Sequence, residues 1–588
     1  MSDRAGWSLV TTVLIVLAAA AALRCAWLTA DPPTQPAVGI IWHDEGAWVH
    51  NARNRALWGT WRTDEWNPVF VAPVFTALEY GAFRAFGVGT WQARTVPVAS
   101  GLLAVVFLYA GLAALAGRRA ALIGGALLAT NYVFVMWNRA ALMESTMTAC
   151  IVASWAAYAF AERRPAAGLL AGAAVVLAWF TKAAAAFFVA ALVLDAATTM
   201  ILSWSARARR LSGLDEPSAA AFRAACWTLG GVTAAGAVIL AAFVLPYWSE
   251  YQFYNWQMSV TRKPAYTLRA LMDRASWLPI VHDFFTRMWL VTSVAALGLT
   301  TIVLKWRAAR PAERLLVLWV LLGLAELVVH DAGNERRYLM FIPALVALAA
   351  LVLGRAGAVA PRAGDVGQFS RWLALPIVFL LAYLVIGSLL RLAVLGEIGH
   401  GVRFSAALAA VAGLLIAWRW RAICEWLARQ QITAHAALAL TVIAVVGDLV
   451  QYGQWAVSRT YENHRASIEL GRVLPPGTLV HGKLANGLSL ENRIRPIFVG
   501  RGFGNYEDRT TRDDVRYILT YIAPSLGYES QRQNPVIKDV LDAYPNRSII
   551  MTFDVAETAT GRDRAALIDK FGGAGTRMNG QTTGRAHN

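Results

Sequence analysis

The sequence predicts a polytopic α-helical membrane protein with a small polar α/β domain at its C-terminal end. Of its 588 residues, 57% are hydrophobic and only 15% are charged, whereas soluble proteins are roughly 25% charged. Long apolar runs recur from the N-terminus to about residue 456. The basic residues lie in short clusters between these runs, so the net charge of +17 reflects membrane topology rather than a nucleic-acid-binding face.

About thirteen apolar runs have the ~17–25 residues that cross a bilayer as a helix. They cover about residues 7–28, 93–116, 119–137, 140–161, 166–181, 184–204, 224–247, 284–305, 313–331, 337–355, 371–394, 402–420 and 433–456. The first run is longer than the apolar core of a signal peptide, so we expect a retained helix. The stretch 165–204 is divided at Lys182, because one helix of that length would overrun the membrane.

The basic clusters fall on alternate loops, which assigns those loops to the cytoplasmic side. An odd number of spans then places the loop 30–92 and the C-terminal segment on the same external face. We therefore expect a multi-pass protein of the cytoplasmic membrane whose external loop and C-terminal domain face the periplasm or exterior.

The sequence changes character after the last span. Residues 457–575 are polar and contain short β-type runs at 478–481, 497–499, 517–521 and 548–553, separated by turn signals. This pattern predicts an extracytoplasmic α/β domain after a transmembrane domain at 1–456. The tail 576–588 is rich in Gly, Thr and Asn, and we expect it to be disordered.

Two adjacent acids, Asp44 and Glu45, lie in the first external loop. Acids near a membrane often mark a functional site, although in a loop they can simply be solvated. Their neighbours include Trp42 and Trp48, and aromatic side chains suit either a membrane-interface belt or the face of a sugar. The loop is therefore a candidate catalytic region.

Charged residues on other external segments are further candidates. Arg139 and Glu144 are five positions apart, so they need not pair along one helix and can face a shared cavity. Interfacial placement of each is the alternative. Lys182, Arg336 and Arg337 are cations on the face where topology predicts few. A phosphate at the membrane surface would explain them, and scattered interfacial anchors are the alternative.

Taken in order, these segments resemble the motifs of the GT-C glycosyltransferases. The resemblance rests on the acid doublet, the segment from Asn67 to Pro73, Arg139 to Glu144, Thr181-Lys182, and Arg337-Tyr338 to Pro343. The most similar subgroup contains the protein O-mannosyltransferases and the lipid A aminoarabinose transferase. The resemblance covers about residues 5–355.

The resemblance implies an inverting glycosyltransferase that uses a polyprenyl-phosphate sugar and acts on a lipid, glycan or protein acceptor at the outer membrane face. The catalytic acids implied are Asp44, Glu45 and Glu144. The residues implied for the donor phosphate are Lys182, Arg336, Arg337 and Arg139. The residues expected to contact substrate are Trp42, His43, Trp48, Asn67 and Tyr338.

Several alternatives stay open at the level of sequence. Some members of the family hold a divalent cation, and His43, Glu45 and Glu144 offer nitrogen and oxygen ligands for one. A transporter or flippase of lipid-linked sugars would share the apolar spans but is expected to show symmetrical halves, which the sequence lacks. A non-catalytic membrane assembly subunit would share the fold without needing the acids. The sugar, the acceptor and the essential member of the doublet are not specified.

Overall fold

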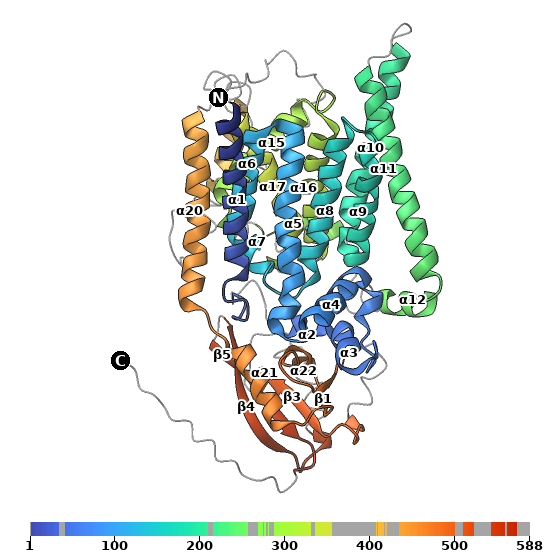
Figure 1. Cartoon of the computed structure of the whole chain (residues 1–588), viewed down its shortest axis with the longest axis vertical. Coiled ribbons are helices and arrows are strands. Elements are labelled where there is room, and N and C mark those ends of the chain that lie inside the picture. The colour runs from blue at the N-terminus through green and yellow to red at the C-terminus, as the bar shows by residue number, and fades with distance from the viewer. Residues whose placement is uncertain are drawn as a thin grey trace.

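The computed structural model describes residues 2–33, 42–209, 216–256, 287–330, 335–355, 434–499, 510–521, 542–558 and 561–572, with short pieces between 268 and 280 and between 407 and 419. The chain forms a bundle of long helices, and a small sheet domain lies at one end of this bundle (Figure 1). The predicted fold class, a polytopic helical membrane protein with a small C-terminal sheet domain, is confirmed.

The long helices form the membrane region. In chain order the bundle helices are α1 (Ser2–Cys25), α5 (Thr90–Ala116), α6 (Arg118–Thr130), α7 (Tyr132–Trp137), α8 (Met143–Ala161), α9 (Ala167–Thr181), α10 (Ala186–Arg209), α11 (Glu216–Ile239), α15 (Trp289–Leu304), α16 (Pro311–His330), α17 (Ile342–Gly354) and α20 (Ala434–Ser458). The shorter helical elements before the sheet domain are α2 (Trp42–Trp48), α3 (His50–Trp58), η1 (Pro68–Phe70), α4 (Pro73–Phe86), η2 (Ala183–Ala185), η3 (Leu240–Val244), α12 (Trp248–Trp256), η5 (Leu268–Met272) and η7 (Glu335–Met340).

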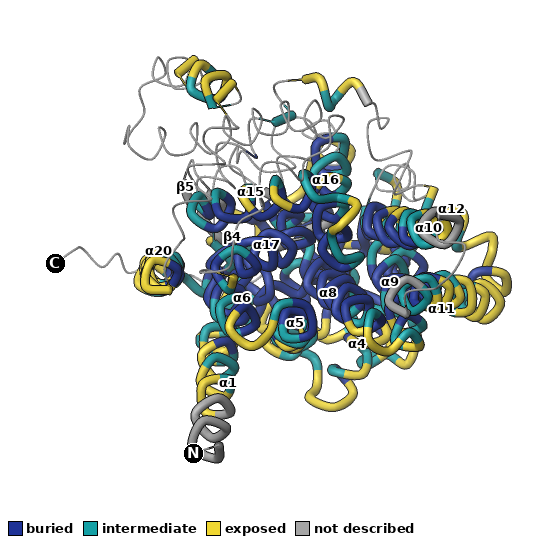
Figure 2. Tube along the Cα trace, turned by 90° about the horizontal axis from the view of Figure 1, so that it is seen from above, coloured by how far each residue is buried: buried dark blue, intermediate teal, exposed yellow. Residues whose placement is uncertain are grey.

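The bundle has a buried centre and an apolar rim. Helices α8 and α17 are buried in the middle, whereas α20 and α11 lie at the edge with exposed sides (Figure 2). Among the described residues, four helical stretches are long and apolar enough to cross a membrane, namely Thr90–Ala116, Ala183–Trp204, Ala219–Val244 and Ala434–Val473. The exposed apolar side chains of the rim match a lipid environment.

The observed helices follow the predicted spans closely where the structure describes them. The predicted division at Lys182 is present, because α9 ends at Thr181 and η2 begins at Ala183. The predicted span 119–137 is instead two helices, since the Asn131 side chain accepts a hydrogen bond from the Phe134 amide and starts α7 anew. The predicted span 371–394 and most of 402–420 lie outside the described residues, so the number of spans stays a prediction.

The sheet domain contains five strands and two helices in the described part of the chain. They are α21 (Glu462–Val473), β1 (Leu479–His481), α22 (Lys483–Gly487), β2 (Arg495–Ile497), β3 (Tyr517–Tyr521), β4 (Ser548–Thr558) and β5 (Gly561–Asp569). The strand order is β2-β1-β3-β5-β4, with β1 parallel to β2 and β3, and β5 antiparallel to β3 and β4. Strand β5 was not predicted, because its polar start carries no β-type run. The predicted tail 576–588 lies outside the described residues.

The sheet domain packs on the end of the bundle that carries the acid doublet, as the predicted topology requires. Arg53 of α3 is fully buried and donates to the carbonyl oxygens of Ser489, Asn492 and Ile494 at 3.0 Å each. His50 Nε2 lies 2.8 Å from Asp64 Oδ1, and the other Asp64 oxygen accepts from the Phe498 amide. The external loop is therefore held by backbone groups of the sheet domain.

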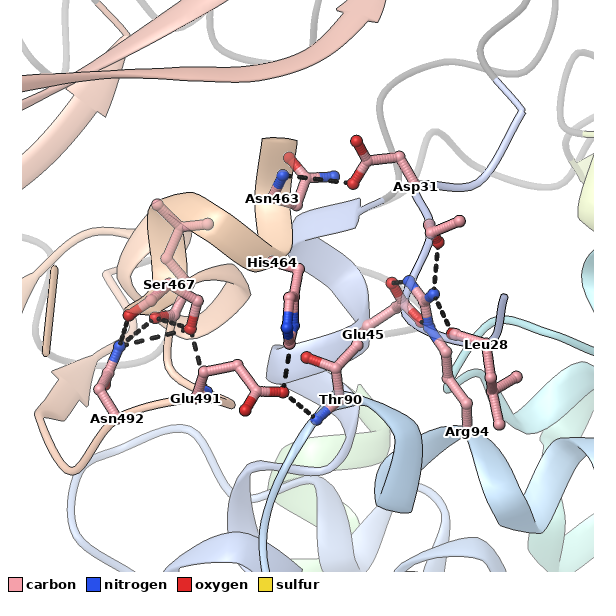
Figure 3. Close-up of polar contacts among 12 residues, drawn as sticks. Leu28, Asp31, Glu45, Thr90, Arg94, Asn463, His464, Ser467, Glu491 and Asn492 are labelled. Carbon is pink, nitrogen blue, oxygen red and sulfur yellow. Dashed lines mark hydrogen bonds and ion pairs between the residues drawn. The ribbon is translucent and has the colours of Figure 1, made fainter. Parts of the chain in front are cut away.

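Helix ends supply a second set of contacts across this junction (Figure 3). Glu491 accepts from the Thr90 amide at 2.7 Å, at the start of α5. Asp31 accepts from the Glu462 and Asn463 amides at the start of α21. Both carboxylates meet amide groups that have no partner within their helices, an arrangement that the helix dipole also favours.

Gly46 marks the closest approach between the two regions, and its substitution tests their docking. A Cβ at Gly46 would lie 1.8 Å from the Asn486 carbonyl oxygen of α22. We expect Gly46→Ala to force α2 and α22 apart and lower stability by about 1–3 kcal/mol, the usual cost of overpacking. Thermal unfolding and limited proteolysis of the sheet domain measure the effect.

The matched control is Gly81→Ala on α4, where a Cβ would meet nothing within 4 Å. This variant is expected to be neutral or slightly more stable, because alanine is the better helix former. Identical proteolysis of both variants would contradict the close packing of α2 on α22.

Candidate active site

The two acids of the doublet point to different partners. Consecutive residues on a helix project about 100° apart, so α2 directs them to different neighbours. Glu45 forms a two-pronged ion pair with Arg94 of α5, with Nε to Oε1 at 2.8 Å and Nη2 to Oε2 at 2.7 Å. It also accepts from the Ala141 amide at 2.7 Å. Through these contacts Glu45 connects α2 to α5 and to the segment before α8 that contains Ala141.

Asp44 instead joins a cluster assembled from four separate segments. Arg336 of η7 donates from Nη1 to Asp44 Oδ2 at 2.8 Å, and its Nε lies 3.4 Å from Glu144 Oε1. Lys182 Nζ donates to the same Glu144 oxygen at 2.5 Å. The structure thus brings together Asp44, Glu144, Lys182 and Arg336, four of the predicted site residues. We call this set the acid–base cluster.

Local structure explains how each member reaches the cluster. Glu144 is in the first turn of α8, after the extended residue Leu142, so its carboxylate sits near the amide end of a helix. Lys182 occupies the turn between α9 and η2. Asp44 and Arg336 keep partial exposure, with side chains 15% and 13% exposed, whereas the Glu144 side chain is 3% exposed.

Burial lowers the pKa of the Lys182 side chain. Its side chain is 13% exposed, and the loss of solvation lowers the pKa of the ammonium to about 8, although the neighbouring Glu144 carboxylate acts in the opposite direction. Arg336 and Arg337 lower this pKa further, because like charges disfavour protonation. The acid–base cluster itself balances two cations with two acids, and Arg337 adds a third positive charge near Lys182.

Arg337 borders the cluster rather than bridging it. Its Nη2 lies 3.1 Å from His330 Nε2, and its Nη1 lies 3.9 Å from Glu326 Oε1. Because Arg337 is close enough to affect the pKa of Lys182, it adds to the positive potential there.

Arg139 has a different neighbourhood from the one the resemblance implies. Its guanidinium donates to the carbonyl oxygens of Leu23, Arg24 and Trp27, at the end of α1, and stacks on Trp455 at 4.7 Å. The structure does not bring it into the acid–base cluster. Sequence reasoning also missed Arg94, whose pairing with Glu45 could have been suspected only from the need to balance two adjacent acids.

The predicted substrate contacts lie on separate elements, with Trp48 in α2, Asn67 before η1 and Tyr338 in η7. Trp48 is buried against Trp66 at 5.4 Å between ring centroids, and Tyr338 is 1% exposed. Asn67 is buried and its Oδ1 has no hydrogen-bond partner among the described residues. The side chains of Trp42 and His43 lie outside the described part of the structure.

The described residues do not assemble a metal-binding set. No group of three or more His, Cys, Asp or Glu side chains in this part of the chain could hold an ion. Two of the three predicted ligands, Glu45 and Glu144, are each engaged by cationic side chains, which compete with a metal for the same oxygens.

Comparison with known proteins identifies the fold of this protein. Residues 70–214 match the family model described as dolichyl-phosphate-mannose-protein mannosyltransferase. The crystal structure of ArnT from Cupriavidus metallidurans in the apo state aligns with a TM-score of 0.51 and 18% identity, covering 97% of this chain and 99% of that one. A search of curated protein sequences finds no match.

Two further solved structures align less well. ArnT from Cupriavidus metallidurans bound to undecaprenyl phosphate gives a TM-score of 0.47 at 16% identity, covering 96% of this chain and 98% of that one. AglB from Archaeoglobus fulgidus, an archaeal oligosaccharyltransferase in complex with an inhibitory peptide and a dolichol-phosphate, gives 0.45 at 12%, covering 95% and 74%.

The chain is therefore a multi-pass membrane protein with the GT-C fold. It is similar to ArnT over nearly its whole length and to the protein mannosyltransferases over residues 70–214. These findings confirm the resemblance predicted from the motifs and support the prediction that the protein is a glycosyltransferase.

The different partners of the doublet predict different effects of substitution on stability. Glu45→Gln leaves Arg94 buried without its counter-charge, and breaking one side of a buried ion pair typically costs about 3–5 kcal/mol. Asp44→Asn is expected to cost much less, because Arg336 keeps a second acidic partner in Glu144 at 3.4 Å. Thermal unfolding of the two variants in the same detergent compares them. Equal melting temperatures would contradict the structural role of Glu45.

Proposed function

We propose that this protein is an inverting glycosyltransferase that moves a sugar from a polyprenyl-phosphate donor to an acceptor on the outer face of the cytoplasmic membrane. The observation that carries the proposal is the bridge made by Arg336, which contacts Asp44 from the external loop and Glu144 from α8. Two acids from distant segments thus share one cluster with two cations. That combination suits the transfer of a group away from a phosphate.

Lys182 and Arg336 are proposed to bind the donor phosphate. A lysine ammonium has three N–H donors, and Lys182 gives one of them to Glu144. The others can reach phosphate oxygens. The ArnT that shares this fold has been crystallised with undecaprenyl phosphate, and a ligand of that chemistry fits the positive potential around Lys182.

Asp44 is proposed as the general base. It accepts the proton of an acceptor hydroxyl, whose oxygen attacks the anomeric carbon opposite to the phosphate. The bond from that carbon to the phosphate oxygen breaks, and its electron pair stays on the polyprenyl phosphate. The added negative charge is stabilised by Lys182 and Arg336. Glu144 holds both cations in place and is the second acid of the site.

Several observations separate this proposal from its alternatives. Glu45 is assigned to structure rather than to proton transfer, because Arg94 and the Ala141 amide occupy both of its oxygens. Arg139 is assigned to capping α1. A transporter would not need an acid poised beside a cation pair at one face. A non-catalytic subunit would tolerate loss of Asp44.

The first test of the mechanism is Asp44→Asn. A positioned base typically contributes about 10²–10⁴-fold in rate, so we expect that loss in sugar transfer by membranes supplied with native polyprenyl-phosphate sugars. Binding of undecaprenyl phosphate should not weaken, because the substitution removes a negative charge near Arg336. Transfer at the wild-type rate would reject Asp44 as the base and favour the non-catalytic subunit.

The second test uses pH. Lys182 carries its charge below its pKa of about 8 and loses it above. Above about pH 8 the Lys182 amine is mostly neutral and must take up one proton before it can bind an anion. The affinity for undecaprenyl phosphate is therefore expected to fall about tenfold between pH 7 and pH 9. The phosphate monoester itself is mostly the dianion over this range, since its second pKa is about 6.

Lys182→Arg is the matched control, because arginine keeps its charge throughout. The variant is expected to bind undecaprenyl phosphate with little change between pH 7 and pH 9. The same decline in both proteins would show that Lys182 does not hold the phosphate.

A further inference from the structure

The buried face of α4 carries two polar side chains that the proposed mechanism does not use. This helix buries Phe75, Thr76, Glu79 and Phe83. Thr76 and Glu79 are three residues apart, so they lie one above the other on the same side of the helix. Both are 0% exposed. The face is therefore apolar except for one hydroxyl and one carboxyl group.

Neither side chain has a hydrogen-bond partner among the described residues. The Thr76 hydroxyl and both oxygens of Glu79 are buried and unsatisfied. Other buried acids at this end of the bundle differ, because Glu45 is held by Arg94 and Asp64 by His50. An unsatisfied buried polar group is destabilising. Two such unsatisfied groups next to each other, on an otherwise apolar helix face, indicate a ligand-binding site.

Glu79 is suited to bind a neutral ligand rather than a cation or a phosphate. Burial raises its pKa well above the usual range, and the nearby Glu45 carboxylate raises it further. A protonated carboxyl group has one donor and remaining acceptor capacity, and the threonine hydroxyl has both as well. Such a pair can hydrogen-bond to hydroxyl groups.

The position of this pair connects it to the acid–base cluster. Glu79 is close enough to Glu45 to feel its charge, and Glu45 directly precedes Gly46 and follows Asp44 on α2. Helix α4 also packs against α9, whose C-terminal end is capped by Lys182. The buried face of α4 is thus next to the elements that carry the proposed base and the proposed phosphate-binding cation.

We infer that Thr76 and Glu79 form a subsite that hydrogen-bonds the hydroxyl groups of the sugar on the lipid-linked donor. The inference rests on the proposed function, because the phosphate held by Lys182 and Arg336 keeps the attached sugar within a few ångströms of the cluster. The phosphate is attracted to the cations Lys182 and Arg336. The uncharged pair Thr76 and Glu79 is therefore available to bind the sugar. Phe75 and Phe83 make the rest of this buried face apolar.

The experiment compares lipid capture by purified full-length variants in detergent. Each protein is incubated with a lipid extract of the source membranes, and the bound polyprenyl phosphates are quantified by mass spectrometry with and without a sugar. The wild type is expected to enrich the glycosylated lipids over undecaprenyl phosphate. Glu79→Leu should lower that enrichment about tenfold or more, which corresponds to at least one lost hydrogen bond to a buried group.

Three further variants identify which groups make the hydrogen bonds. Glu79→Gln is neutral and keeps a donor and an acceptor, so it should retain most of the enrichment. Thr76→Val should lose part of it, whereas Thr76→Ser should not. Glu79→Leu is expected to melt at a higher temperature than the wild type, because it removes an unsatisfied buried group, so reduced capture cannot result from unfolding.

Each other outcome has a defined meaning. Equal enrichment by wild type and Glu79→Leu, or no enrichment by the wild type, would overturn the sugar subsite while leaving the phosphate site intact. An acceptor subsite would also leave the enrichment unchanged in Glu79→Leu. Failure of every protein to bind undecaprenyl phosphate would instead reject the proposed function, and with it this inference.

Discussion

The bridge from Arg336 to Asp44 and Glu144 is the interaction on which the site depends. It connects the external loop, helix α8 and η7, which are far apart in the sequence. Lys182 adds a fourth segment through Glu144. An assembly of this kind is stable only when charges of both signs are present, because a buried acid or base alone is costly. A bound phosphate would exchange one set of ionic contacts for another.

The external loop can present Asp44 because other residues hold the loop from both sides. Glu45 and Arg94 attach α2 to the bundle, whereas Arg53 and the close contact at Gly46 attach α2 and α3 to the sheet domain. The sheet domain therefore acts as a support for the acid-bearing helix. In physical terms the adjacent acids divide two tasks, one structural and one proposed to be chemical.

The elements that could be predicted from the sequence are those with local signals. Apolar length and basic clusters gave the spans and the turn at Lys182, and motif order gave the fold family. Partner choice could not be predicted, because the capping of α1 by Arg139 and the pairing of Glu45 with Arg94 join segments distant along the chain. Glu79 was missed for a different reason, because a lone acid in an amphipathic helix usually faces solvent.

An experimental structure with undecaprenyl phosphate bound tests the central claim most directly. The account predicts phosphate oxygens within about 3.2 Å of Lys182 Nζ and an Arg336 nitrogen, with Asp44 and Glu144 in the same pocket. A phosphate bound away from these residues, or Asp44 and Glu144 in separate cavities, would contradict it.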